Sequence, residues 1–354
     1  MLIFLTACTL QDVSQDGEPI KIGGLFALTG YASFAGEASR NGFLMAIEDA
    51  GGSTQYVVED FQSDVKNAVT AAKKLTNIDG VSVVIGPEWK EFSVAIVPIA
   101  EATTTLFISP WMTGEDMVSD YFMTATPSER YQIKKTLEYM NQQGQKNIIL
   151  LYSQNAWSIG YADIFKEEIK KFPTLNIVAE FTTQQDTNDY RTEITKIQKT
   201  NPDAIFTAIA TDDGQGIFGK ELQEMGVDIP VYTAYSRGSS DVLLNKFSDV
   251  VEGVMYGAPS PYAKQDEFRE KYRKRFGKDP SAISAATTYD MTSIVLRALK
   301  SGTKTSADVR KYIEKQEAFE GYSNIIRFDK KGQLLPGTAV IEQIQNGQRV
   351  TIAE

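Results

Sequence analysis

Strand-like and helix-like segments alternate along most of this 354-residue chain, and this alternation restricts the fold more than any other feature. In the first half, short runs rich in β-branched residues recur at 20–28, 56–61, 81–86 and 105–110. The stretches between them have helical spacing; Phe43, Ile47 and Ala50, for example, share one helical face. This order predicts an α/β protein with a parallel sheet and helices on both faces.

The same order begins again in the second half of the chain. A helix is predicted to begin near Ser128 and to end at Gly144, because serine caps helix starts and glycine ends helices. Further strands are predicted at 147–153, 176–181, 204–209 and 230–235. No Pro/Ser-rich linker divides the two halves. We therefore expect two Rossmann-like lobes that face each other across a cleft.

All three tryptophans of the chain follow predicted strands. Trp89 and Trp111 follow strands of the first half, and Trp157 follows a strand of the second half. Ligands of open α/β sheets bind outside the carboxyl ends of the strands. An aromatic-lined ligand cleft is therefore the favoured interpretation, and ordinary core packing of tryptophan is the alternative.

Composition excludes several classes of function. The chain contains no histidine and one cysteine, and its net charge is −10. Histidine is the commonest general base and metal ligand, and one cysteine forms neither an internal disulfide nor a thiolate zinc site. The densest basic run, residues 269–278, is interpreted as the solvated face of one helix. We expect no nucleic acid, no metal, no cofactor and no enzymatic activity.

The single cysteine follows an apolar start, in the segment Leu5-Thr6-Ala7-Cys8. This segment resembles the box of a bacterial lipoprotein signal, in which the cysteine carries the lipid. Residues 1–19 are then a signal remnant and a polar tether, and the protein is expected outside the cytoplasm on a membrane surface. Only seven residues precede Cys8 and none is positively charged, so a truncated start or an accidental run of small residues stays open.

From Ile20 onward the sequence resembles the type I periplasmic binding proteins of the branched-chain amino acid (Leu/Ile/Val) transport class. The segments that carry the resemblance are IKIGGLFALTGYASFAGEASRNGFLMAIEDAGG, VSVVIGPE, LFISPWMT, DTNDYRTEITKIQKTNPDAIF, ELQEMGVDIPVY and FREKYRKRFGKDPSAISAATTYDM. The family implies a Venus-flytrap clamshell that closes on a small solute and, acting as a monomer, delivers it to the permease and ATPase subunits of an ABC importer.

The resemblance also implies how the chain divides between the lobes. Three crossovers are expected near 123–127, 252–258 and 326–332. Lobe 1 then comprises 20–125 plus 254–328, and lobe 2 comprises 126–253 plus 329–354. The strand within 338–347 is expected to return to lobe 2.

Family resemblance further implies a carboxylate site on lobe 1. Lys90 stands where the family has a serine that binds the α-carboxylate of the ligand. Thr113 keeps the position of the family threonine, and a backbone contribution is expected from Trp111. An ammonium group beside helix N-terminal amides is a favourable anion site, so Lys90 is expected to bind an anionic group and Trp89 to form the wall. The alternative is that Lys90 extends into solvent.

Other contact positions depart from the family pattern. Phe34 lies one residue before the usual aromatic position, and Trp157 matches the aromatic residue of the second lobe. Tyr235 stands where the family has the acid that pairs with the α-ammonium, and Arg237 follows two residues later. Lys90 and Arg237 together favour a ligand with more negative charge, such as an organic or aromatic acid, whereas Asp212 keeps an amino acid possible; both alternatives stay open.

The sequence also contains features of three rival functions. Gly214-x-Gly216-x-x-Gly219 follows a strand and opens a helix, as a dinucleotide fingerprint does, but it follows a late strand and has no catalytic histidine. Asp212 and Asp213 are adjacent, so their side chains diverge and disfavour shared acid–base chemistry. A sensor or regulatory receptor of the same fold, not coupled to transport, is the remaining alternative.

Overall fold

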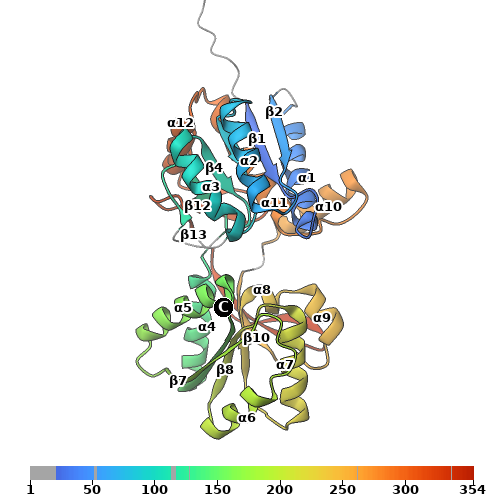
Figure 1. Cartoon of the computed structure of the whole chain (residues 1–354), viewed down its shortest axis with the longest axis vertical. Helices are drawn as coiled ribbons and strands as arrows, with labels where there is room; N and C mark the ends of the chain where they lie inside the picture. Colours follow the sequence, from blue (N-terminus) through green and yellow to red (C-terminus); the bar gives the residue numbers. More distant parts are fainter. Residues whose placement is uncertain (1–20, 52–53, 113–116, 127, 261, 336) are drawn as a thin grey trace, which may run out of the picture.

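The structure, a computed structural model, describes residues 21–51, 54–112, 117–126, 128–260, 262–335 and 337–354. Cys8 and Thr113 lie outside this part of the chain. Figure 1 shows two lobes, each built around one large sheet and joined by several passages of the chain. The predicted α/β class and two-lobe architecture are confirmed.

The first lobe contains a parallel sheet with the strand order β2-β1-β3-β4-β5. Its strands are β1 (Ile22–Phe26), β2 (Tyr56–Asp60), β3 (Val83–Ile85), β4 (Leu106–Ser109) and β5 (Phe122–Thr124). Its helices are α1 (Ser33–Asp49), α2 (Val65–Asn77), α3 (Lys90–Thr103), α10 (Lys264–Phe276), α11 (Ser284–Lys300) and α12 (Ser306–Lys315). A small antiparallel sheet joins β11 (Phe319–Glu320), β12 (Ile325–Phe328) and β13 (Leu334–Leu335).

Helices cover both faces of this sheet because its strands are apolar on both sides. Along β3, Val83 and Ile85 pack against α1, α11 and α12, whereas Val84 packs against α2 and α3. Along β4, Leu106 and Ile108 alternate with Phe107 in the same way. A strand that is buried on both faces needs such continuous apolar sequence, which is why these runs were recognisable.

The second lobe contains a mixed sheet with the order β15-β14-β10-β9-β8-β6-β7. Its strands are β6 (Asn147–Ser153), β7 (Asn176–Thr183), β8 (Ala204–Ala208), β9 (Val231–Thr233), β10 (Met255–Pro259), β14 (Ala339–Gln345) and β15 (Gln348–Ala353). Its helical segments are α4 (Arg130–Gln142), α5 (Ala156–Glu168), η2 (Ile169–Lys171), α6 (Arg191–Thr200), α7 (Asp212–Glu224), α8 (Tyr235–Gly238) and α9 (Asp241–Phe247). The strands from β7 to β10 are parallel, but β14 and β15 are antiparallel, which the prediction of purely parallel sheets missed.

The second and third crossovers lie further along the chain than predicted. The chain leaves lobe 2 after Pro259 and leaves lobe 1 after Leu335. The assignment of 254–259 to lobe 1 is wrong, because the backbone of β10 pairs with β9 and β14. The assignment of 329–335 to lobe 2 is also wrong, because β13 pairs with β12 and Leu334 lies in the core of lobe 1. The first crossover lies between β5, which ends at Thr124, and α4, which begins at Arg130.

The crossovers are tied to one another by hydrogen bonds. Gln333 Nε2 donates to the carbonyl of Thr126 at 3.2 Å, which joins the third passage to the first. The Ser260 amide donates to the carbonyl of Thr338 at 2.9 Å, which joins the second to the third. Because β5 and β10 end where the chain crosses, the carboxyl ends of the parallel strands in each sheet face the other lobe (Figure 1).

Candidate functional site

Five aromatic rings gather where the strands of lobe 1 end, and we refer to them as the lobe-1 aromatic cluster. They are Tyr31, Phe34, Trp89, Phe92 and Trp111. Trp89 is the centre, with ring centroids 6.0 Å from Tyr31, 5.9 Å from Phe34 and 6.1 Å from Trp111. Tyr31 and Phe34 are 64% and 45% exposed, although large rings are normally buried. The cluster therefore leaves apolar surface exposed beside the carboxyl ends of the lobe 1 strands.

The backbone of Trp89 is held in a conformation that is unusual for a residue with a side chain. Its φ is +63° and its ψ is 145°, a region populated mainly by glycine. The Trp89 amide donates to the carbonyl of Trp111 at 2.8 Å, and the Trp89 carbonyl accepts from Ser93 Oγ at 2.9 Å. These two hydrogen bonds fix the backbone at the start of α3. The bond between the Trp89 amide and the Trp111 carbonyl also holds the two loops that carry these tryptophans together.

Lys90 and Glu91 begin α3 directly after Trp89. Lys90 is partly buried, as its position at the start of a helix beside the rings requires. Glu91 accepts a hydrogen bond from the hydroxyl of Tyr31, and burial together with this carboxylate raises the pKa of Tyr31. Glu91 is thus already engaged by a member of the lobe-1 aromatic cluster.

The loop that carries Tyr31 is organised by one carboxylate at the end of β2. Asp60 accepts from the amides of Leu28 at 2.9 Å and Gln62 at 2.7 Å, and from the amide and hydroxyl of Thr29 at 3.3 and 2.9 Å. Burial alone would raise the pKa of Asp60, but these four hydrogen bonds together lower it. Asp60 therefore fixes the loop in front of α1.

A second group of side chains lies where the strands of lobe 2 end, and we refer to Trp157, Tyr161, Asp212 and Arg237 as the lobe-2 cluster. Trp157 follows β6 in the first turn of α5, with its ring centroid 5.6 Å from that of Tyr161. The guanidinium carbon of Arg237 lies 5.7 Å from the centre of the Trp157 ring. Arg237 Nη1 donates to Asp212 Oδ1 at 2.6 Å. Burial lowers the pKa of Arg237, and Asp212 opposes that shift.

Tyr235 is the one described candidate whose ring the structure places elsewhere. Its ring packs near Tyr256, with centroids 6.3 Å apart, and against the cluster that contains Val340. Its amide donates to the hydroxyl of Tyr161 at 3.4 Å, so its backbone adjoins the lobe-2 cluster. At the position where the resemblance implies an acid, this chain therefore presents main chain rather than a charge.

Sequence reasoning missed three features of these clusters. Tyr31 sits three residues before Phe34, and Tyr161 follows Trp157 by one helical turn, so both spacings were available signals. The pairing of Asp212 with Arg237 was not predicted, because the two residues are 25 positions apart and follow different strands.

The glycines of the apparent dinucleotide fingerprint serve helix packing. A Cβ on Gly216 would lie 2.3 Å from the Phe247 ring, and a Cβ on Gly219 would lie 2.4 Å from the Val250 carbonyl. The glycines therefore allow α7 to approach α9 and the turn after it. Asp213 pairs with Lys246 at 2.7 Å, away from the Asp212–Arg237 pair, as the predicted divergence of the two aspartates requires.

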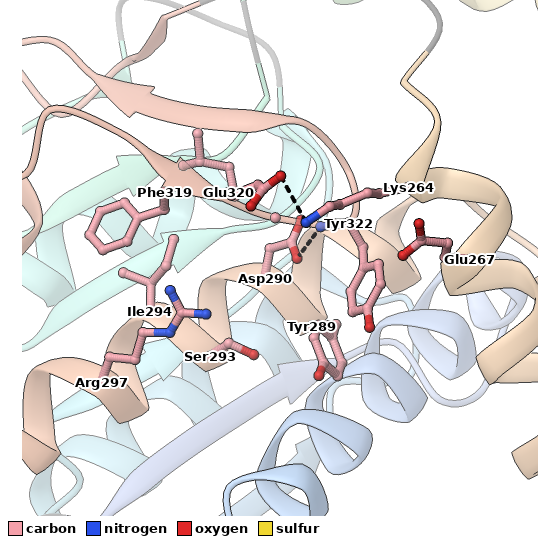
Figure 2. A pocket seen from close by; sticks show the side chains of 12 residues that line it. Lys264, Glu267, Tyr289, Asp290, Ser293, Ile294, Arg297, Phe319, Glu320 and Tyr322 are labelled. Carbon is pink, nitrogen blue, oxygen red and sulfur yellow. Dashed lines mark hydrogen bonds and ion pairs between the residues drawn. The ribbon is translucent and has the colours of Figure 1, made fainter.

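A cavity of about 250 Å³ lies apart from both clusters, between α10, α11 and the hairpin of β11 and β12 (Figure 2). Asp290 accepts hydrogen bonds of 2.7 Å from the amides of Tyr322 and Ser323 on its wall. Lys264 pairs with Glu320 at 2.8 Å across the rim. These polar groups fasten the hairpin to the helices, so we interpret the cavity as part of lobe 1 packing.

The basic run at 269–278 lies largely on α10, and its cations pair with nearby acids. Arg273 pairs with Asp279, Lys274 with Glu270, and Arg275 with Glu48. No helix in the described part of the chain has the length and apolar character needed to cross a membrane.

These elements define a two-lobed α/β protein that presents aromatic and charged side chains where its two sheets end, the usual location of ligand sites in open α/β sheets. A family model described as periplasmic binding protein matches residues 19–348, and the chain belongs to this family. The resemblance inferred from the sequence is confirmed.

Individual relatives share the fold at low sequence identity. The Leu/Ile/Val-binding protein homolog 8 of Brucella melitensis biotype 1 is 20% identical, over 94% of this chain and 90% of its own. The branched-chain amino acid transporter substrate binding protein LivJ from Streptococcus pneumoniae, in complex with isoleucine, has a TM-score of 0.76 at 23% identity and covers 95% and 100% of the two chains. A solute binding protein of an ABC transporter from Rhodopseudomonas palustris BisB5, in complex with 3,4-dihydroxybenzoic acid, has a TM-score of 0.77 at 22% identity and covers 95% and 96%.

Proposed function

We propose that this protein is an extracytoplasmic receptor that binds a small carboxylate-bearing ligand between its lobes and passes it to an ABC importer. The ligand is an amino acid or an organic or aromatic acid. The observation that carries the proposal is the position of the two clusters. Exposed aromatic rings in lobe 1, and Trp157 beneath Arg237 in lobe 2, follow the strand ends that face the opposite lobe.

The proposed mechanism divides the ligand between the two lobes. On lobe 1, Lys90, Thr113 and the Trp111 backbone bind the carboxylate at the start of α3, where helix amides favour an anion. The rings of Phe34 and Trp89 contact the apolar part of the ligand. Lobe 2 then closes and brings its cluster, with the Tyr235 backbone, onto the other side.

Two relatives support this class of ligand. One solved relative contains isoleucine and another contains 3,4-dihydroxybenzoic acid, and both compounds have a carboxyl group. Because each relative is less than 25% identical to this chain, the choice between an amino acid and an aromatic acid depends on the residues of the site.

The proposal includes a lipid anchor at Cys8 and coupling to a permease and an ATPase. A lipid on Cys8 would hold a monomeric receptor at the membrane surface, next to the permease. Cys8→Ser in the expressed precursor should move the protein from the membrane fraction to the soluble fraction after cell lysis. Retention of this variant in the membrane fraction would argue against the anchor.

Intrinsic tryptophan fluorescence tests the binding proposal directly, because the protein contains three tryptophans and all three lie in the two clusters. We expect at least one compound among leucine, glutamate, an aromatic acid and a dicarboxylate to change the emission saturably. Trp157→Phe should remove the lobe-2 part of that change. A folded protein that responds to none of these compounds would contradict the proposed ligand class.

A further inference from the structure

The ion pair between Arg237 and Asp212 limits which carboxylates the site can accept. The two side chains are only 19% and 20% exposed, and their charged atoms lie 2.6 Å apart. Arg237 also lies over the Trp157 ring. Each charge is therefore the main counterion of the other in a partly desolvated place, where removing one partner is costly.

An amino acid ligand would need one carboxylate for its α-ammonium group. The guanidinium of Arg237 already occupies Oδ1 of Asp212, so an ammonium group could reach only the second oxygen of that carboxylate. It would then lie beside the positive charge of Arg237, which repels it. Glu91, the carboxylate beside the lobe-1 aromatic cluster, already accepts from the hydroxyl of Tyr31. Of the two carboxylates, Asp212 is the one whose charge is already balanced by a cation.

A ligand carboxylate, in contrast to an ammonium group, can bind to hydrogen-bond donors that the ion pair leaves unused. Arg237 has five N–H donors, and the bond to Asp212 uses Nη1. Its Nε is buried without a hydrogen-bond partner in the described part of the chain. The guanidinium therefore retains donors for a second carboxylate while Asp212 holds it over Trp157.

We propose that the ligand is a small aromatic or branched monocarboxylate without an amino group, that Arg237 joins Lys90 at its carboxylate when the lobes close, and that Asp212 positions Arg237. This inference rests on the proposed function and narrows its ligand class. Because Asp212 is committed to Arg237, the site discriminates against the ammonium group of an amino acid.

The decisive comparison uses two pairs of compounds that differ only by the α-ammonium group. Isothermal titration of the purified protein is carried out with 3-phenylpropionate against L-phenylalanine, and with 4-methylpentanoate against L-leucine. At least one deaminated acid should bind about 100-fold more tightly than its amino acid twin, because an ammonium group buried without a partner costs roughly 3 kcal/mol.

Variants at the ion pair separate the two roles. Arg237→Gln should weaken binding of the deaminated acid by about 10- to 100-fold, the usual effect of losing a charge-assisted hydrogen bond. Asp212→Asn should weaken it by a few fold, because the amide no longer holds the guanidinium over Trp157 through a charge-assisted hydrogen bond. Asp213→Asn is the matched control on the same helical turn, since the Asp213 carboxylate pairs with Lys246 and is 57% exposed. This variant should bind the deaminated acid as tightly as the unmodified protein does.

Two outcomes would overturn the inference. If the amino acids bind more tightly than their twins and Asp212→Asn removes that preference, Asp212 binds the ammonium group, and the proposed function stands without this inference. If the folded protein binds no compound of either series, the inference fails, and the proposed function fails with it only if glutamate and a dicarboxylate also leave the tryptophan emission unchanged. The ligand comparison uses the unmodified protein, so it holds even if a variant does not fold.

Discussion

At the scale of single residues, Lys90 is the position where this chain departs most clearly from a neutral carboxylate site. It is the first residue of α3 and follows Trp89, whose backbone is held at positive φ. A backbone conformation that costs about 1–3 kcal/mol is kept only where the surrounding contacts enforce it. The bonds to Trp111 and Ser93 do so here, and they fix the direction in which α3 begins.

Lys90→Ala should weaken binding of the ligand by about 1.5–3 kcal/mol, because a carboxylate loses a charge-assisted partner. Titration calorimetry measures this difference. Lys73→Ala, on the exposed face of α2, is the control and should leave the affinity unchanged. A change of less than about 0.5 kcal/mol for Lys90→Ala would mean that its ammonium group does not contact the ligand.

Glu88, one residue before Trp89, should make the stability of the protein depend on pH. It is 2% exposed, and neither carboxyl oxygen has a hydrogen-bond partner in the described part of the chain. Burial raises the pKa of Glu88 from 4.5 to about 7, against weaker opposing effects of Ser39 and the Ala27 backbone. The native state therefore binds the proton more tightly than the unfolded state between these pH values.

The direction of the pH dependence follows from this difference in proton binding between the native and unfolded states. The contribution of Glu88 to stability is fully present below about pH 4.5 and is lost as the pH rises through about 7. Glu88→Gln should remove this dependence and stabilise the protein at pH 8 by up to about 3 kcal/mol. Thermal unfolding of both proteins between pH 5 and pH 8 measures it, and parallel curves would show that the carboxyl is not buried in the native state.

At the scale of elements, one aspartate joins the ends of β1 and β2 to the start of α1. Asp60→Ala removes four hydrogen bonds and should reduce the free energy of unfolding by about 1–3 kcal/mol. Ligand affinity should fall as well, because the loop positions Tyr31. Asp60→Asn retains one acceptor oxygen and should recover part of both losses, as denaturant unfolding and titration would show.

The approach of α7 to α9 depends on the missing side chain of Gly216. Gly216→Ala places a methyl group 2.3 Å from the Phe247 ring and should destabilise the protein by about 1–3 kcal/mol. Phe247→Leu in the same protein should relieve part of this loss, and chemical denaturation of the single and double variants measures the coupling. Independent effects of the two substitutions would contradict the packing role of Gly216.

Two strands that are buried on both faces were predictable from the sequence, whereas the place of β10 in the lobe 2 sheet was not. The runs 81–86 and 147–153 contain β3 and β6, because continuous apolar sequence has few other stable environments. The prediction missed β10, with the sequence MYGAP, as a strand of lobe 2. Its partner β14 lies 80 residues further on, and a contact over that distance leaves no local signal.

At the scale of the whole molecule, the three crossovers are the natural place for a hinge. Gln333 with Thr126, and Ser260 with Thr338, tie them into one unit. We expect the radius of gyration measured by small-angle X-ray scattering to fall when ligand is added, as the lobes close. Arg237→Gln at the same ligand concentration should stay open, and an unchanged radius at saturating ligand would exclude closure.

The general position of the site followed from the sequence, but its electrostatics did not. The three tryptophans were predicted to follow strands, and strand ends of parallel sheets meet at one edge. Asp212 was interpreted as a substitute partner for an ammonium group and Arg237 as an anion binder. Their pairing changes both interpretations, because a charge that already has a counterion is a different recognition group from an isolated one.

The order in which the chain visits the lobes has a consequence for biosynthesis. Lobe 1 begins at the first strand but receives α11, α12 and β13 only between residues 284 and 335, and Met291 and Val295 of α11 belong to its core. The sheet of lobe 2 gains β14 and β15 only at residues 339–353, after the chain has returned from lobe 1. A nascent polypeptide therefore cannot complete lobe 1 before β13 has been synthesised, nor lobe 2 before β15, so neither lobe reaches its native core by folding its first segment alone.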